Sequence, residues 1–309
     1  MIKMNGLRTL ALSRNHLTGT IPGDVFGMRN LEHLHLYANQ MRGKIPAEVQ
    51  NAKKLKSLLL GNNLLFGTLV TELGRVTTLE EFGIGFNEFW RKVPTEFGLL
   101  TNLKWLVMEE NRFSGRLPTE FGRLSHMEYW LMSNNLMHGT LPLELANLSR
   151  LREWRFANTG LGGEFPSEFG AVMTNLYRLE MGKNNFKGTI MTEFGLMTQL
   201  SWLAMNDNDL TGYIPTEFGH LVNMTRLSLQ DTLIQGNIPT ELGLMKQLKD
   251  LTLDKTRLTG AAPAEVCALR DSKTLALFVT DCEARGNVGI ECEIPQCCTF
   301  CRRGESGNN

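Results

Sequence analysis

Residues 103–126 read LKWLVMEENRFSGRLPTEFGRLSH, and residues 127–150 read MEYWLMSNNLMHGTLPLELANLSR. Both stretches follow the frame L-x-x-L-x-L-x-x-N-x-L-x-G-x-I-P-x-E-x-G-x-L, with each defining residue at the same offset. A fixed period of this length predicts one continuous array of stacked repeats rather than separate cores. The frame restarts every 24 residues, with a single spacing of 25, at Leu7, Leu31, Leu55, Leu79, Leu103, Met127, Leu151, Leu176, Leu200, Met224 and Leu248.

The first half of the frame predicts a short strand and the turn that ends it. Apolar and polar residues alternate there, as in HLHLY at residues 33–37, which is typical of a strand with one buried face. The Asn that follows can bond backbone groups that lose their ladder partners at the turn. Thr159, Thr232 and Thr256 replace it with a shorter hydroxyl, so we expect those turns to be less well braced. The Asn residues are Asn15, Asn39, Asn63, Asn87, Asn111, Asn135, Asn184 and Asn208.

The second half of the frame predicts the outer side of each coil. Gly occupies the twelfth offset in every repeat but one, where Arg91 stands, so a Cβ would disturb the backbone there. A proline at the fifteenth offset removes a hydrogen-bond donor and prevents a full sheet on that side. A Thr-Glu-Phe-Gly string or a relative follows, and we expect its Thr to cap a short helical turn with the Glu in the first turn.

These motifs carry a family resemblance. The strings LTGTIP at 17–22, SGRLPTEFG at 114–122 and LTGYIPTEFG at 210–219 resemble plant-type leucine-rich-repeat proteins, including receptor-like kinase ectodomains and polygalacturonase-inhibiting proteins. The resemblance covers about residues 7–270 and implies an α/β solenoid. We therefore expect a right-handed horseshoe with a concave parallel β-sheet and short helical or 3-10 turns on the convex side. Departures from the pattern are Val70 and Met191 in place of Pro, and one inserted residue near 171–175.

The chain is divided by this pattern into three parts. Residues 1–270 hold the eleven repeats, residues 271–301 form a cysteine-rich cap that begins with a strand over 275–279, and residues 302–309 form a flexible tail. An even number of cysteines crowded together favours disulfides, although the last two could instead belong to a zinc site. The pairing stays open among fifteen possibilities for Cys267, Cys282, Cys292, Cys297, Cys298 and Cys301.

Charge, hydropathy and cysteine content limit the classes of binding partner and the cellular locations expected for the protein. Lys plus Arg number 32 and Asp plus Glu number 32, so the chain has no net field to hold nucleic acid. No apolar run is long enough to cross a membrane, and we expect no membrane insertion by this chain itself. The cysteine-rich end indicates an extracellular or cell-surface location. Because residues 1–6 lack a secretory signal, we expect the natural start to lie upstream, and any membrane anchor to lie outside this chain.

No catalytic residue, metal site or cofactor is predicted. The many Glu residues recur at one offset of the frame, whereas catalytic carboxylates need environments that differ from their neighbours. His33 and His35 share one strand face with Tyr37, but neighbouring strands offer no third metal ligand. Phosphate loops, nucleophile elbows and zinc-protease motifs are absent from the sequence.

The residues that break the repeat on the exposed strand face are the candidates for binding. Aromatic and arginine side chains dominate binding energy once water is excluded, and they gather in the middle of this face. An alternative is a self-satisfied surface, in which Trp202 stacks between two arginines and Glu153 pairs with one of them. The predicted patch is Trp105, Val107, Tyr129, Leu131, Arg155, Arg178, Trp202 and Arg226, with Phe86 and Trp90 as an extension.

These observations predict a non-enzymatic recognition module that binds a protein, peptide or cell-wall glycan on its concave face. A receptor-like ectodomain with a role in signal transduction, or a secreted binder, fits this description best. The alternatives are a structural or adhesive extracellular repeat protein and an inhibitor of secreted hydrolases. Fold alone does not separate these functions, because function depends on the site.

Overall fold

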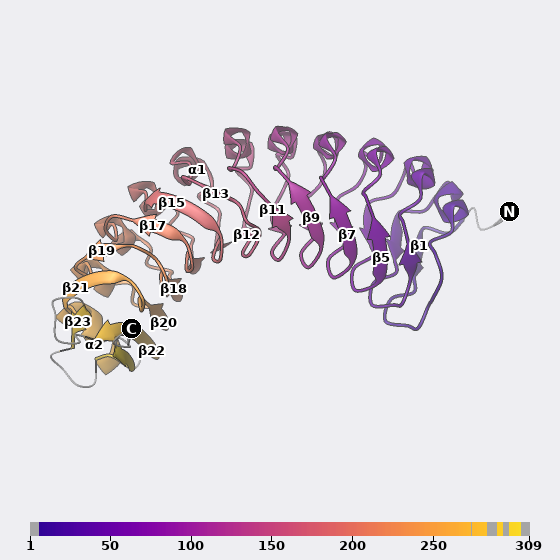
Figure 1. Cartoon of the computed structure of the whole chain (residues 1–309). Helices are drawn as coiled ribbons and strands as arrows, with labels where there is room; N and C mark the ends of the chain where they lie inside the picture. Colours follow the sequence, from indigo (N-terminus) through magenta and orange to yellow (C-terminus); the bar gives the residue numbers. More distant parts are fainter. Residues whose placement is uncertain (1–5, 273, 283–288, 293–296, 304–309) are drawn as a thin grey trace, which may run out of the picture. The chain divides into compact units, whose positions relative to one another are not determined.

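The computed structural model describes residues 6–272, 274–282, 289–292 and 297–303. The chain divides into two compact units, residues 1–161 and 162–309. Each unit is a stack of coils in which strands run along one side and short helices along the opposite side (Figure 1). The predicted leucine-rich-repeat solenoid with a parallel sheet and short 3-10 turns is confirmed.

The first unit contains seven parallel strands in one sheet, and every pair is in register at the same repeat offset. We call the solvent-facing side of this sheet the strand face. On the opposite side of each coil lies a 3-10 helix, and the core fills the space between. The strands are β1 (Thr9–Ala11), β2 (His33–His35), β4 (Ser57–Leu59), β6 (Glu81–Gly83), β8 (Trp105–Val107), β10 (Tyr129–Leu131) and β12 (Glu153–Arg155). The helices are η1 (Gly23–Gly27), η2 (Ala47–Asn51), η3 (Thr71–Arg75), η4 (Thr95–Leu99), η5 (Thr119–Arg123) and η6 (Leu143–Asn147).

A second, five-stranded sheet is formed by the segments that follow β2, β4, β6, β8 and β10. It contains β3 (Arg42–Gly43), β5 (Leu64–Gly67), β7 (Glu88–Arg91), β9 (Arg112–Gly115) and β11 (Leu136–Met137). The glycine at the twelfth offset has a positive φ throughout the unit, for example 86° at Gly115. Arg91 adopts the same left-handed conformation, with φ 71°, which explains why glycine is preferred at this offset.

The second unit repeats this architecture. Its strand face consists of β14 (Arg178–Glu180), β16 (Trp202–Ala204), β18 (Arg226–Ser228), β20 (Asp250–Thr252) and β22 (Leu277–Cys282). The other strands are β13 (Gly162–Gly163), β15 (Asn185–Thr189), β17 (Asp209–Thr211), β19 (Gln235–Gly236), β21 (Arg257–Ala261), β23 (Gly289–Glu291) and β24 (Phe300–Arg303). The helices are α1 (Glu168–Val172), η7 (Thr192–Leu196), η8 (Thr216–His220), η9 (Thr240–Leu244) and α2 (Ala264–Asp271).

The repeating Asn bonds backbone groups at the turn, as the sequence predicts, and it also joins one coil to the next. Asn111 is 7% exposed, and its Oδ1 accepts the Phe89 backbone N–H at 3.0 Å. Its Nδ2 donates to the carbonyl oxygens of Ile84 and Met108. By contrast, the Thr232 hydroxyl donates only to Leu229 of its own repeat. The amide therefore spans two coils where the hydroxyl reaches one.

The prediction that Thr caps the short helices is wrong. The residue before each 3-10 helix is usually the proline, as Pro94 is for η4, and no side-chain capping bond forms there. The Thr95 hydroxyl instead donates to the Glu96 carboxylate at 3.4 Å. Proline at this position already fixes φ for entry into the helix, so the Thr lies one residue too late to cap.

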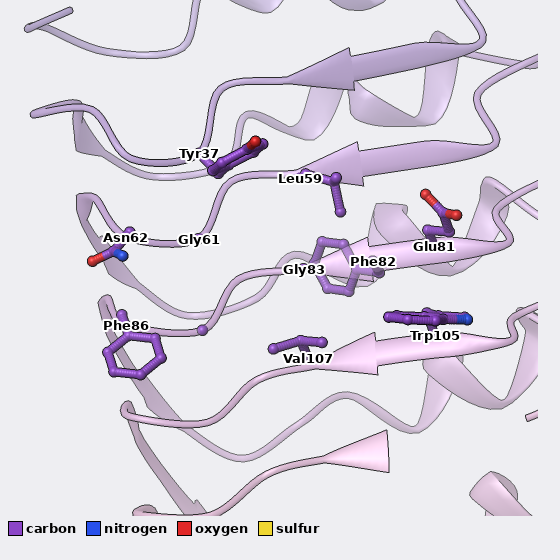
Figure 2. Close-up of a pocket in the computed structure, with 11 residues that line it drawn as sticks. Tyr37, Leu59, Gly61, Asn62, Glu81, Phe82, Gly83, Phe86, Trp105 and Val107 are labelled. Atoms are coloured by element: carbon purple, nitrogen blue, oxygen red, sulfur yellow. The ribbon is translucent and has the colours of Figure 1, made fainter. Parts of the chain in front are cut away.

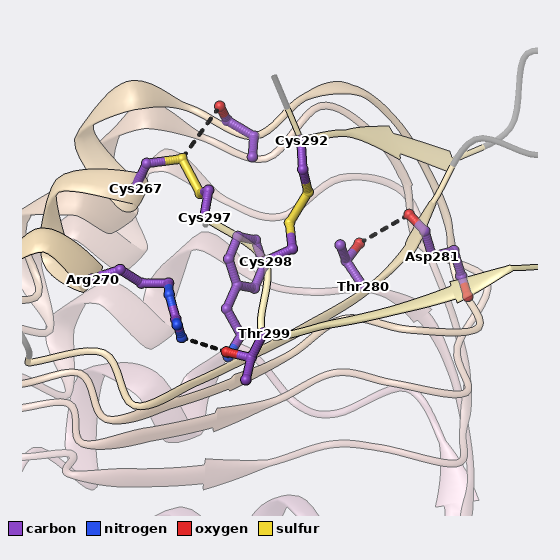
Figure 3. Close-up of a disulfide and its surroundings, with 10 residues drawn as sticks. Cys267, Arg270, Thr280, Asp281, Cys292, Cys297, Cys298 and Thr299 are labelled. Carbon is purple, nitrogen blue, oxygen red and sulfur yellow. Dashed lines mark hydrogen bonds between the residues drawn. A yellow bond between two sulfur atoms is a disulfide. The ribbon is translucent and has the colours of Figure 1, made fainter. Parts of the chain in front are cut away.

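The cysteine-rich end is closed by disulfides, which excludes the zinc alternative for the cysteines whose side chains are described. Cys267 of α2 bonds Cys297, and Cys292 bonds Cys298 (Figure 3). Arg270 donates to Thr299, which anchors the same segment against α2 (Figure 3). The strand predicted at 275–279 is present as β22. The side chains of Cys282 and Cys301 lie outside the described part of the structure, as does most of the predicted tail at 302–309.

Candidate functional site: an apolar hollow on the first strand face

A hollow of about 470 Å³ lies on the strand face of the first unit (Figure 2). Leu59, Gly83 and Val107 lie side by side in its middle, on the adjacent strands β4, β6 and β8. Its walls come from the same strands and from the turns that follow them. The remaining lining residues are Tyr37, Gly61, Asn62, Glu81, Phe82, Gly85, Phe86 and Trp105.

The hollow exists because glycines, which have no side chains, occupy outward positions of its floor. Gly83 and Gly85 occupy two successive outward positions of one repeat. Gly61 occupies the position equivalent to Gly85 in the repeat before it. A Cβ on Gly83 would lie 3.1 Å from the Leu59 Cδ2, and a Cβ on Gly85 would lie 3.2 Å from the Val107 Cγ1. Side chains at these positions would therefore fill the floor of the hollow.

Aromatic side chains frame the hollow. The Trp105 side chain is 46% exposed, and its ring centroid lies 4.2 Å from that of Tyr129 on the neighbouring strand. Phe86 is 50% exposed at the opposite wall (Figure 2). Its backbone has φ 56°, a left-handed conformation that Asn and Asp tolerate better than a bulky residue does. The fold therefore does not require an aromatic residue at position 86. A role in the wall of an apolar ligand site would explain it.

The other predicted residues of the first unit lie beside the hollow or away from it. Val107 lines it, and Leu131 is half-buried next to Val107 in the register of the sheet. Arg155 lies two strands beyond β8 and is held by Glu109 at 3.4 Å and Glu153 at 3.2 Å. Trp90 belongs to β7 in the second sheet, where it packs under the Arg91 guanidinium, and it does not line the hollow.

The predicted residues of the second unit form a different kind of cluster. The Arg178 guanidinium carbon lies 3.9 Å from the Trp202 ring centroid, and that of Arg226 lies 4.4 Å from it. Arg178 also bonds Glu180, and Arg226 pairs with Asp250 at 2.8 Å. The stacked arrangement weighed as the alternative is therefore the one found around Trp202, and both of its arginines already have carboxylate partners.

A chain of hydrogen bonds reaches the hollow from one side. The Ser57 hydroxyl donates to the Glu81 Oε2 at 2.6 Å, and it lies 2.9 Å from the His35 Nε2. A hydroxyl has one hydrogen, so the His35 Nε2–H donates to Ser57. Burial lowers the pKa of His35, and the neighbouring His33 lowers it further. Because Ser57 is buried and gives its hydrogen to a carboxylate, this row of hydrogen bonds does not activate Ser57 as a nucleophile.

Sequence reasoning missed several residues of the hollow, namely Tyr37, Gly61, Glu81, Gly83 and Gly85. The available signal was the string Gly83-Ile84-Gly85, which is too short for a phosphate loop but removes two successive outward side chains. Within the described residues, no group of three or more His, Cys, Asp or Glu side chains is placed to hold a metal ion. The described helices include none that is long and apolar enough to span a bilayer.

Family models for the leucine-rich repeat match residues 5–65 and 102–124, in agreement with the coils described above. The chain therefore contains leucine-rich repeats, and it resembles plant receptor-kinase ectodomains, as the sequence motifs predict. None of the curated proteins matches its sequence.

Solved structures sharpen this resemblance. The ectodomain of the Arabidopsis thaliana membrane receptor kinase GASSHO1/SCHENGEN3, in complex with CASPARIAN STRIP INTEGRITY FACTOR 2, is 29% identical, with a TM-score of 0.78 over 87% of this chain and 35% of that one. The plant peptide hormone receptor RGFR1, in complex with RGF2, is 30% identical, with a TM-score of 0.77 over 89% of this chain and 47% of that one. The chain thus spans less than half the length of either receptor chain.

A third neighbour shows that the same fold serves another purpose. A plant ice-binding protein is 27% identical, with a TM-score of 0.66 over 75% of this chain and 74% of that one. Similar coils therefore occur in proteins with unrelated ligands, so the ligand of this chain has to be argued from its own side chains.

Proposed function

We propose that the chain is a non-enzymatic recognition module that binds a peptide, or an extended segment of a protein, on the strand face of its first unit. The observation that carries the proposal is the apolar hollow framed by Trp105 and Phe86. Exposed aromatic side chains around an apolar depression are typical of sites that bury a ligand side chain. The receptor ectodomains with peptide partners among the structural neighbours support the same kind of ligand.

The proposed setting is extracellular, as part of a receptor-like ectodomain or a secreted binder. The disulfides that close the C-terminal end support this setting, because such bonds persist in oxidising compartments. Binding needs little rearrangement, because hydrogen bonds between the coils hold the strand face in place.

The test fills the hollow without disturbing the coil. In Gly83→Leu, the new Cβ meets only the flexible end of the Leu59 side chain, at 3.1 Å, so we expect the fold to tolerate it. The matched control is Ala204→Leu, at the equivalent outward position of β16 in the second unit. The wild-type protein and both variants are immobilised and exposed to a peptide fraction from an extracellular extract.

Peptides captured by the wild type are then synthesised and titrated calorimetrically. We expect Gly83→Leu to weaken their binding by at least tenfold, and Ala204→Leu to leave it unchanged. Equal binding by the wild type and Gly83→Leu would refute the proposed site. A spacer or adhesive protein would capture no peptide whose binding depends on residue 83.

A further inference from the structure

Glu81 is the ionisable carboxylate in the wall of the hollow. It begins β6, is half-buried, and lies between Ser57 and Trp105 in the register of the sheet. Its Oε2 accepts the Ser57 hydroxyl hydrogen. Among the residues that the structure describes, no lysine or arginine forms an ion pair with Glu81. The nearby Lys104 bonds Glu80 instead, at 2.7 Å.

The histidine behind Ser57 does not neutralise this carboxylate. His35 donates through its Nε2–H to Ser57, a role that the neutral ring fulfils. Since burial lowers the pKa of His35, the ring stays uncharged near neutral pH. Glu81 therefore faces the apolar hollow without an ion-pair partner among the described residues.

Other carboxylates lie on or beside the strand face of the first unit. The Arg155 guanidinium lies 3.4 Å from Glu109 and 3.2 Å from Glu153. Glu110 accepts the Asn134 amide, which carries no charge. Glu81 and Glu110 therefore have no ion-pair partner among the described residues, and both would repel an anionic ligand at the hollow.

We infer that the hollow takes an apolar or aromatic side chain of a cationic peptide, and that an adjacent ammonium or guanidinium group of the same peptide pairs with Glu81. This inference rests on the proposed function. An apolar side chain that covers the hollow removes water from Glu81, and a desolvated carboxylate without a positive partner is costly. A neighbouring cation offsets that cost, whereas a neutral or acidic neighbour leaves it uncompensated.

The test compares three libraries of short synthetic peptides, randomised except for a central Phe-Arg, Phe-citrulline or Phe-Glu pair. Citrulline keeps the shape of arginine and removes its charge. The library peptides that the immobilised wild-type chain captures are resynthesised in all three forms and titrated calorimetrically. We expect the arginine form to bind about 30-fold more tightly than the citrulline form at low salt, with a smaller ratio at high salt.

Two variants locate the preference. Glu81→Gln should bring the arginine-to-citrulline ratio close to one, because it removes the ion pair with the arginine form and the desolvation cost that the citrulline form meets. Glu80→Gln removes the adjacent carboxylate, which lies outside the hollow, and should leave the ratio as in the wild type. An arginine-to-citrulline ratio near one in the wild type would overturn the inference, and so would a wild-type ratio that persists in Glu81→Gln. If peptide capture still depends on residue 83 in that case, the proposed function stands. Capture that ignores Gly83→Leu would overturn both.

Discussion

Trp105 and Trp202 occupy the same offset of the repeat, on the strand faces of the first and second units, yet their surroundings differ. Trp105 borders a hollow and stacks on Tyr129, with much of its ring exposed. Trp202 lies between two guanidinium groups that are themselves paired with carboxylates. The comparison teaches that residue type and strand offset do not by themselves make a binding site. A binding site also needs contacts that the protein has not already made.

A second comparison is between the two residue types at the turn after each strand, because Asn bridges coils in both units, as Asn208 does in the second. Asn111 in the first unit bonds two coils, whereas Thr232 in the second unit bonds only its own. We expect Asn111→Ala to lower the free energy of unfolding by about 3 kcal/mol, because it leaves the buried Phe89 N–H without an acceptor and removes one donor from each of two buried carbonyls. Thr232→Ala should cost about 1 kcal/mol. Urea unfolding followed by circular dichroism measures both.

Equal losses of unfolding free energy in Asn111→Ala and Thr232→Ala would contradict the idea that the Asn111 amide bridges two coils. The matched control is Asn111→Thr, which should cost less than Asn111→Ala because the hydroxyl can still donate to the carbonyl of residue 108, three residues back, as Thr232 does at its own turn.

Removing each tryptophan tests the comparison directly. We expect Trp105→Ala to weaken the binding of a captured peptide by about 2 kcal/mol, because an exposed aromatic at the rim of an apolar hollow buries its ring only in the complex. Trp202→Ala should leave peptide affinity unchanged and instead lower stability by about 1 kcal/mol, since it removes two cation–π contacts. Calorimetric titration and urea unfolding separate the two effects, and the reverse pattern would move the site to the second unit.

How much the sequence could predict differs between the fold and the site. The period located the strand that begins each repeat, the bracing Asn and the glycine column, because each recurs and each has one physical cause. The same period correctly singled out Trp105, Tyr129 and Trp202 as residues that break the repeat. It did not locate the hollow, because a hollow is made by the absence of side chains at Gly83 and Gly85. It also grouped Trp202 with Trp105, since the stacking of long arginine side chains depends on rotamers that a sequence does not fix.

Arg91 and Trp90 resemble the arginine–tryptophan contacts of the second unit, but on a strained backbone. The guanidinium carbon lies 4.7 Å from the Trp90 ring centroid, and Arg91 has φ 71°. We expect Arg91→Gly to stabilise the chain by about 0.5 kcal/mol, because relief of about 1 kcal/mol of backbone strain exceeds the loss of an exposed cation–π contact. Arg91→Ala should destabilise it by about 0.5 kcal/mol, since the strain stays and the contact goes. Thermal unfolding of both variants measures the difference, and a destabilised glycine variant would mean that the stack outweighs the strain.

The smallest expected effect is a pH dependence of stability that belongs to the first unit. Burial lowers the pKa of His35, and His33, whose ring centroid lies 5.9 Å away, lowers it further. The folded chain therefore binds fewer protons at His35 than the unfolded chain does. The contribution of His35 to stability is complete above its ordinary pKa of 6.5, and it is lost as the pH falls from there through the lowered value.

The strand face of the second unit carries no histidine at the equivalent outward position, where Glu180, Ala204, Ser228 and Thr252 stand. His35→Gln should therefore flatten the loss of stability below pH 6.5, while keeping a donor for Ser57. His33→Gln should flatten it only partly, because it removes the weaker of the two causes. Urea unfolding at a series of pH values on either side of 6.5 distinguishes these outcomes. A wild-type slope that persists in His35→Gln would place the titrating group elsewhere, and the neutral state of the ring behind Ser57 would then lose its support.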